Sequence, residues 1–185
     1  SLEKAARQLG DRAERAEVAF FGGSFTAIDR GYMTALLETA ARACDRYGFA
    51  GVRCSTRPDA VDSERLELLK AHRVTAVELG AQSMDDGVLQ LNRRGHTARD
   101  VENAAGLLRA YGFELGLQMM IGLPGDTDEK AVETARALLR LRPDTMRIYP
   151  TVVLENTALC DWYRAGHYAP QTLEAAVSLC ARLIP

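Results

Sequence analysis

Short apolar segments alternate with amphipathic helical segments along this chain, and the alternation limits the folds that it can adopt. Five segments read as buried strands, each followed by glycine, serine or proline; they span residues 18–21, 51–54, 76–79, 114–121 and 145–149. Helical periodicity predicts main helices over 2–15, 32–47, 63–72, 98–111, 126–141, 158–165 and 171–183. The alternation predicts an α/β fold with a parallel sheet and right-handed crossovers, either doubly wound or barrel-like.

Length and charge restrict the class of protein further. With 185 residues, 47% of them hydrophobic, the chain can bury one good-sized core, so we expect a single domain over residues 1–185. A formal charge of −2 creates no global field that would attract nucleic acid or an anionic membrane. No apolar run approaches the roughly 20 residues that span a bilayer, and the charged N-terminus differs from a signal peptide. These features predict a soluble cytoplasmic protein with no membrane partner.

The cysteine, histidine and glycine patterns exclude several enzyme classes. Cys44, Cys54, Cys160 and Cys180 have no CxxC or CxxxC spacing, so we expect reduced, structural thiols and no metal site. The chain has no HExxH, no P-loop lysine, and no GxGxxG after its first strand. Zinc hydrolase, nucleoside triphosphatase and dinucleotide oxidoreductase functions therefore lack their residues.

The loops that follow the five strands carry the candidate site. The carboxyl ends of parallel strands share one edge, which is where such folds bind ligands. The loops are GGSFT at 22–26, STRPD at 55–59, GAQS at 80–83, GLPG at 122–125 and YPT at 149–151. Gly22 and Gly23 would let backbone amides approach a ligand, although a plain tight turn is the alternative. Together the loops predict a pocket for a small polar molecule.

Polar side chains within apolar strands are further candidates. Gln82 and Gln118 each offer two donors and an acceptor, and Gln118 lies in an otherwise apolar strand. Gln118 either faces the pocket or bonds to neighbouring backbone, because a buried amide without partners costs free energy. Glu78 presents the same choice, with more force because a carboxylate carries charge. Arg93, Arg94 and His96 form either part of the site or a solvated basic turn.

Five segments in order resemble the radical S-adenosylmethionine superfamily. They are VAFFGGSFTAI, CSTRPDAVD, VTAVELGAQSMDDGVLQLNRRGHT, LQMMIGLPGDT and MRIYPTVVLENTAL, and the likeness runs from about Glu17 to the C-terminus. TRPD, GAQS, NRRGHT and IYPT most resemble the elongator catalytic subunit branch, whereas GGS and IGLPG are shared with oxygen-independent coproporphyrinogen oxidase. The resemblance implies a partial, TIM-like parallel βα-barrel, with five of the family's six strands visible here.

The resemblance also implies a binding face for S-adenosylmethionine. At the amino acid end of that ligand, Gly22, Gly23 and Ser24 match the glycine-rich loop that binds the methionine amino group. Arg94 aligns with an arginine that can meet the carboxylate.

Other positions match the nucleoside end of the ligand. Ser55 and Gln82 align with contacts to the sulfonium ligand and its ribose. Gln118, Met120 and Tyr149-Pro150 fall where the family lines its ribose and adenine pocket. Ser55 departs from the family pattern, because related enzymes often carry an acidic residue near that position.

One family motif is missing. The superfamily reduces S-adenosylmethionine to a 5′-deoxyadenosyl radical with a [4Fe–4S] cluster held by a CxxxCxxC loop, and no cysteine here has that spacing. The chain begins with a helix and with Ser1. We therefore expect a truncated core of a larger radical enzyme, with the cluster only in the full-length parent and no reductive cleavage by the chain itself.

Two other functions remain open at this point. The chain could be a complete, catalytically inactive ligand-binding or interaction module of the same fold. An ordinary βα-barrel lyase is the third reading, but Lys4, Lys70 and Lys130 all lie on predicted helices. The resemblance implies either tRNA or a tetrapyrrole as the parent's substrate. Because the family's first strand is missing, we also expect an exposed edge at 18–21, which pairs with another chain or is covered by the helix over 2–15.

Overall fold

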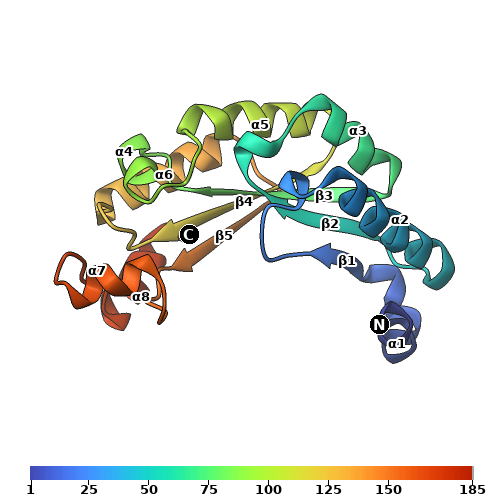
Figure 1. Cartoon of the computed structure of the whole chain (residues 1–185), viewed down its shortest axis with the longest axis horizontal. Coiled ribbons are helices and arrows are strands. Elements are labelled where there is room, and N and C mark those ends of the chain that lie inside the picture. Colours follow the sequence, from blue (N-terminus) through green and yellow to red (C-terminus); the bar gives the residue numbers. More distant parts are fainter. Residues whose placement is uncertain (185) are drawn as a thin grey trace.

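The computed structural model describes residues 1–184 and contains one five-stranded parallel sheet (Figure 1). The strands lie side by side in sequence order and are β1 Glu17–Phe20, β2 Gly51–Thr56, β3 Val74–Gln82, β4 Glu114–Ile121 and β5 Thr145–Pro150. All five predicted strands are confirmed. The largest difference is β3, which continues through Gly80 to Gln82 because it pairs with a strand on each side.

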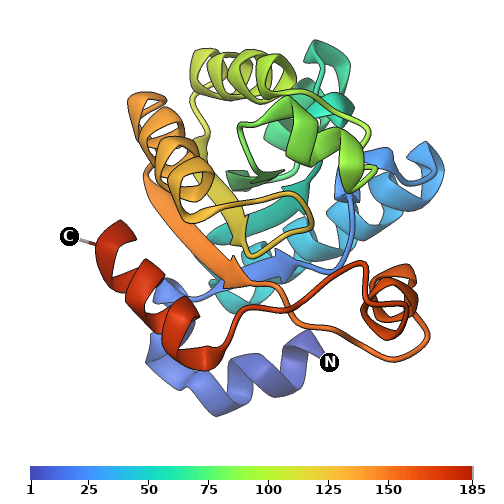
Figure 2. The ribbon, with the colours of Figure 1, turned by 90° about the vertical axis from the view of Figure 1, so that its left-hand side faces the viewer.

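The main helices cover one face of the sheet. They are α2 Arg30–Tyr47, α3 Ser63–Ala71, α5 Ala98–Ala110 and α6 Asp128–Arg140. Figure 2 looks roughly along the strands and shows the sheet curling, with these helices around its outside. A doubly wound sheet would carry helices on both faces, so the structure excludes that alternative and confirms a partial, TIM-like βα-barrel.

Side-chain caps and glycines set the helix boundaries. Thr127, rather than Asp126, caps α6 by accepting from the Lys130 amide, and Gly48 ends α2 in the left-handed conformation at φ 74°. The predicted N-terminal helix divides at Gly10 (φ 54°) into α1 Leu2–Leu9 and the 3₁₀ segment η1 Gly10–Arg15. The remaining elements are α4 Asp86–Leu91, α7 Ala158–Arg164, α8 Leu173–Leu183 and the 3₁₀ turns η2 Phe25–Ala27 and η3 Pro58–Ala60.

Alternation along each strand separates the core from the concave face. Along β4, Leu115, Leu117, Met119 and Ile121 are buried in the hydrophobic core, which also contains Leu37, Leu66, Leu79, Leu108 and Leu138. Because successive side chains point to opposite faces, the residues between them face the inside of the half-barrel. Most of these inward residues are polar, and they include Arg53, Ser55, Glu78, Gln118 and Arg147. The concave face is therefore the polar face.

The two ends of the sheet are open edges within residues 1–184. There, β1 pairs only with β2, and β5 only with β4. The N-terminal helix α1 packs against α2 and adds no strand beside β1. In the same residues, no helix is both long and apolar enough to cross a bilayer.

Candidate functional site

A cavity of about 660 Å³ lies at the carboxyl ends of the strands. This volume is within the range of roughly 300–1,000 Å³ that small-molecule sites occupy. Its walls come from all five strands or the loops after them, and from the turn after α4. The lining residues are Phe21, Gly22, Gly23, Ser24, Ser55, Thr56, Arg57, Gly80, Gln82, Arg94, Gln118, Arg147 and Tyr149.

Eight of the ten residues predicted for the binding face line this one cavity: Gly22, Gly23, Ser24, Ser55, Gln82, Arg94, Gln118 and Tyr149. Met120 and Pro150 do not line it, although they lie on β4 and β5 beside residues that do. The parallel sheet brings the eight together because it aligns the carboxyl ends of all its strands. Their roles toward a ligand remain predictions.

The loop after β1 needs glycine for its backbone conformation. Gly22 and Gly23 have φ angles of 94° and 148°, which side-chain-bearing L-residues rarely adopt. No atom lies within 4 Å of where a Cβ would stand on either residue, so the requirement is conformational and not spatial. The loop is therefore a turn that also leaves its backbone accessible at the rim of the cavity.

Gln82 is held in an unusual conformation at the end of β3. Its φ is 65°, and the pairing of β3 with β4 shifts register between Gly80 and Gln82. A Cβ on Gly80 would lie 2.6 Å from Gln82 Nε2, so the amide of Gln82 occupies the space that this glycine leaves. Positive φ at a residue with a long side chain is uncommon and concentrates at functional sites.

Arg94 presents an unpartnered cation to the cavity. Its Nε is buried and has no hydrogen-bond partner among residues 1–184. Burial, and then the charge of Arg57, lowers the pKa of Arg94. Buried charged donors are normally paired, so the guanidinium group of Arg94 suits an anionic acceptor such as a carboxylate.

The three basic residues predicted in the turn at 93–96 have different environments. Arg93 is exposed, as the solvated alternative expects, whereas Arg94 lines the cavity. His96 is buried, and its Nε2 lies 3.0 Å from the Ala81 carbonyl oxygen. His96 therefore supports the end of β3 rather than facing a ligand.

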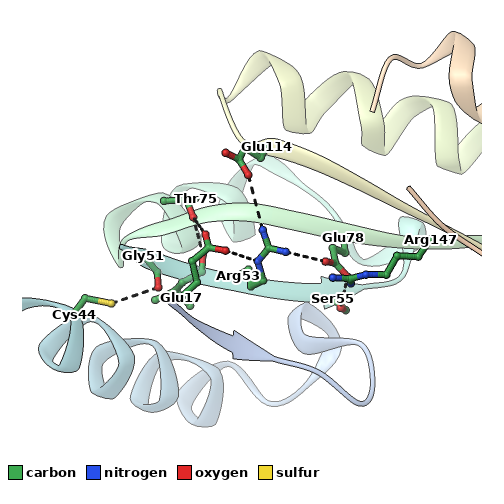
Figure 3. A network of polar contacts seen from close by, with 10 residues as sticks. Glu17, Cys44, Gly51, Arg53, Ser55, Thr75, Glu78, Glu114 and Arg147 are labelled. Carbon is green, nitrogen blue, oxygen red and sulfur yellow. Dashed lines mark hydrogen bonds and ion pairs between the residues drawn. The ribbon is translucent and has the colours of Figure 1, made fainter. Parts of the chain in front are cut away.

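Glu78 is the centre of a polar network under the cavity (Figure 3). Its Oε2 accepts hydrogen bonds from Gln118 Nε2 at 2.7 Å, from Ser55 Oγ at 3.4 Å, and from Arg147. Its Oε1 accepts from Arg53 Nη1 at 3.3 Å, and Arg53 Nε donates to Glu17 at 2.6 Å. The alternative that Gln118 bonds to backbone is wrong, because its amide donates to a side chain on β3.

Sequence reasoning missed three members of this network, Arg53, Arg147 and Glu17. Arg53 and Arg147 were not singled out, yet each lies among apolar residues of a short strand, as Gln118 does. A charged side chain at an inward strand position needs a buried partner, so the same test would have found both. Phe21 was also missed; its ring lies 5.5 Å from the Arg147 guanidinium carbon.

The residues described do not fit an iron–sulfur cluster. Across residues 1–184, no three His, Cys, Asp or Glu side chains are placed to hold a metal ion. The four cysteines are free and come from α2, β2, α7 and α8. Burial raises the pKa of the Cys54 thiol to about 12, which disfavours the thiolate that a metal needs.

Comparison with known proteins identifies two family matches. Residues 1–138 match the model of the Radical SAM superfamily, and residues 143–185 match that of the Radical_SAM C-terminal domain. A tRNA uridine(34) acetyltransferase of Dehalococcoides mccartyi is 30% identical over 97% of this chain and 44% of its own length. Elongator complex protein 3 of Danio rerio is 28% identical over 96% of this chain and 36% of its own length. The chain thus spans less than half of these relatives.

Solved structures show the same fold. Elp3 of the archaeon Methanocaldococcus infernus superposes with a TM-score of 0.87 over 98% of this chain and 47% of that chain, at 23% identity. Coproporphyrinogen III oxidase (HemN) of Escherichia coli superposes with a TM-score of 0.68 over 98% of this chain and 45% of that chain, at 16% identity. At these identities the likeness establishes the fold alone.

Proposed function

We propose, since the chain belongs to the radical S-adenosylmethionine superfamily, that the cavity at the carboxyl ends of its strands binds S-adenosylmethionine. The observation that carries this proposal concerns Arg94, which lines the same cavity as the glycine loop at 22–23 and whose Nε is buried without a hydrogen-bond partner among residues 1–184. A ligand with an α-amino acid group at one end and a nucleoside at the other complements such a wall. The mixed polar lining supplies the remaining donors and acceptors.

Each end of the ligand would meet a different set of residues. Gly22, Gly23 and Ser24 would hold the amino group and Arg94 the carboxylate of the methionine moiety. The nucleoside would meet Gln82, Gln118 and Tyr149, with Ser55 beside the ribose. Met120 and Pro150 lie outside the cavity wall, so we expect them to influence ligand binding only through neighbouring strand residues.

The iron–sulfur chemistry of the family would come from elsewhere in the protein. In this superfamily a [4Fe–4S] cluster supplies the electron that cleaves S-adenosylmethionine. The thiols in residues 1–184 do not fit such a cluster, and the relatives are more than twice as long as the matched region. We therefore propose that a larger enzyme contributes the cluster while this chain contributes the binding face for the cofactor.

Transfer RNA is the substrate we propose for that larger enzyme. The relative at 30% identity is named a tRNA uridine(34) acetyltransferase. The tetrapyrrole alternative has weaker support, because the sequence identity to coproporphyrinogen oxidase is 16% and the similarity concerns the fold alone. The charge of this chain is close to neutral, so tRNA would be held by local contacts rather than by a general positive field.

We also propose that the isolated chain associates with a second copy through β1. Within residues 1–184 this strand has a partner on one side only, and α1 packs against α2. An unpaired strand edge presents backbone donors and acceptors to any other strand.

A calorimetric titration tests the binding proposal. S-adenosylhomocysteine carries the amino acid group, whereas 5′-methylthioadenosine lacks it. We expect Arg94→Ala to weaken S-adenosylhomocysteine roughly tenfold or more, the usual effect of losing a hydrogen bond to a charged group. Binding of 5′-methylthioadenosine should be unchanged, and the exposed neighbour Arg93 provides the control Arg93→Ala.

Affinity should be weak in every case, because the sequence lacks the CxxxCxxC motif that holds the cluster in the family, and the cluster there anchors the amino acid end. Titrations therefore need millimolar ligand. If the wild-type chain binds neither compound at that concentration, the proposed function is refuted.

A further inference from the structure

The geometry points to Glu78 as a positioning residue that fixes the amide of Gln118, so that the cavity floor presents the Gln118 carbonyl oxygen to a ribose hydroxyl. This inference rests on the proposed binding of S-adenosylmethionine and deepens it. Glu78 is not in the cavity wall and touches no ligand; it acts through Gln118, which is in the wall.

The chemistry of the carboxylate decides which way the amide points. An ionised carboxylate only accepts hydrogen bonds, so the end of the Gln118 amide that meets Glu78 Oε2 at 2.7 Å must be the NH₂ group. The oxygen and nitrogen of an amide are otherwise interchangeable in shape. With its nitrogen held by Glu78, Gln118 has its carbonyl oxygen free to accept from a ligand.

The sheet is built to hold Glu78 in this position. Gly116 on β4 is the register partner of Glu78 on β3, and a Cβ on Gly116 would lie 2.6 Å from Glu78 Cγ. Gly116 does not have a positive φ, so the need for glycine here is spatial. The side chain of Glu78 thus leans across β4 through a space that only glycine leaves, toward Gln118 on the same strand.

Two guanidinium groups compensate the buried charge. The side chain of Glu78 is 3% exposed, and an unpaired carboxylate at such a place would strongly destabilise the fold. Arg53 on β2 contacts Oε1, and Arg147 on β5 contacts Oε2 (Figure 3). With Ser55 and Gln118, the two carboxylate oxygens have four donors from three strands. The carboxylate is therefore held from both sides.

A purely structural ion-pair cluster would stabilise the sheet without influencing which ligand binds. A positioning role makes a different prediction, because the orientation of the Gln118 amide sets the preference for a ribose hydroxyl. In Glu78→Gln, residue 78 can donate as well as accept, so the Gln118 amide can adopt both orientations. The readout is therefore the affinity for adenosine relative to 2′-deoxyadenosine and 3′-deoxyadenosine.

We expect the wild-type chain to prefer adenosine over one of the two deoxy compounds by about three- to tenfold, the usual effect of one neutral hydrogen bond. Glu78→Gln should reduce this preference to within about twofold. Gln118→Leu should do the same, and adding Glu78→Gln to it should change nothing further, as a double-mutant cycle requires for a residue that acts through Gln118. Glu17→Gln alters the same network without touching Gln118 and should keep the preference.

Gly116→Ala provides a second route to the same result if Glu78→Gln does not fold, because the added methyl group displaces Glu78. A ligand-free measurement separates the inference from the proposed function. The side-chain amide of Gln118, identified in an ¹⁵N–¹H spectrum by its absence from Gln118→Leu, should show a downfield proton that Glu78→Gln shifts back.

The outcomes divide cleanly. An unchanged adenosine preference in Glu78→Gln, or an amide signal that this variant does not move, overturns the positioning role while leaving the proposed function intact. Failure of the wild-type chain to bind any nucleoside refutes the proposed function, and the amide signal then still decides whether Glu78 orients Gln118.

Discussion

At the scale of single residues, the rim of the cavity concentrates unusual backbone conformations. Gly22 and Gly23 occupy regions that need glycine, and Gln82 adopts positive φ in spite of its side chain. Such a conformation costs about 1–3 kcal/mol and persists where the surroundings enforce it. At Gln82 this conformation goes with the register shift at the end of β3, and the side-chain amide fits into the space beside Gly80, which has no Cβ.

Substitution of Gly80 tests this arrangement. Gly80→Ala places a methyl group 2.6 Å from Gln82 Nε2, which is the end of a flexible side chain. We expect the amide of Gln82 to move, binding of S-adenosylhomocysteine to weaken severalfold, and the free energy of unfolding to fall by less than about 1 kcal/mol. Calorimetry and urea unfolding measure the two effects.

Gly106 gives a matched control in the helical layer. It lies within α5, and no atom is within 4 Å of its would-be Cβ. Gly106→Ala should leave ligand binding unchanged and raise the free energy of unfolding by about 0.5–1 kcal/mol, because alanine is the better helix former. Unaltered binding in Gly80→Ala would show that Gln82 does not contact the ligand.

At the scale of elements, the helices that surround the sheet begin at side-chain caps. Asp29, Asp62, Thr97, Thr127 and Thr172 each accept from the amide three residues later. Only at α5 is the bond reciprocal among these five, because Asp100 also accepts from the Thr97 amide at 2.7 Å. Hydrogen bonds from the side chain and then the backbone of Thr97 lower the pKa of Asp100.

This capping box makes the stability of α5 depend on pH. A lowered pKa in the folded state means that the carboxylate stabilises the fold above the ordinary value of 3.8, and that this contribution is lost as the pH falls through the lowered value. We expect Thr97→Ala to cost about 1 kcal/mol at pH 7 and less at acidic pH, where the wild type has lost the same contribution. Urea unfolding at pH 7 and at the lowest pH that preserves the fold measures both values.

The cap of α8 is the control for this prediction. Thr172 accepts from the Ala175 amide, and no acidic side chain stands at that third position. The cost of Thr172→Ala should therefore not vary in the same way with pH. A pH-independent cost for Thr97→Ala as well would mean that Asp100 contributes nothing to the cap.

At the scale of the whole molecule, one hydrophobic cluster connects the sheet to all of its main helices, from Ala13 to Leu179. Most apolar burial lies on the convex side of the sheet, under the helices that Figure 2 shows around it. The edges of the half-barrel contribute little to this core. We therefore expect the fold to persist when an edge is left unpaired.

Self-association through β1 is the corresponding prediction. Sedimentation velocity over a range of concentrations should show dimers or larger species, and the amides of residues 18–21 should exchange slowly. Ala19→Lys introduces a charge at an exposed position on this edge strand and should favour the monomer. Leu139→Lys, at an exposed position on α6, is the control. A monodisperse monomer with fast exchange along residues 18–21 would contradict the prediction.

Local patterns predicted the elements well and their ends less well. The strand at 114–121 was predicted to its last residue, because its apolar run is followed directly by Gly122 and the turn sequence GLPG. By contrast, Gly80 was predicted to end β3 and does not, since pairing on both sides outweighs the tendency of a glycine to break a strand. The helix over 2–15 is interrupted at Gly10, where φ is 54°, and α1 contains no buried residue whose packing would oppose the break.

What the sequence determined by itself was the set of elements, their parallel order and the loops that meet at one edge, because periodicity and turn residues act over a few neighbours. Only the tertiary structure decided that the helices share one face. It also decided that Glu78 contacts side chains between 23 and 69 positions away in the sequence, namely Ser55, Arg53, Gln118 and Arg147. Contacts between strands depend on register and curl, which no local pattern encodes. For that reason the sequence could have shown Arg53 and Arg147 only as charged residues within apolar strands, and the tertiary structure identified them as partners of the Glu78 carboxylate.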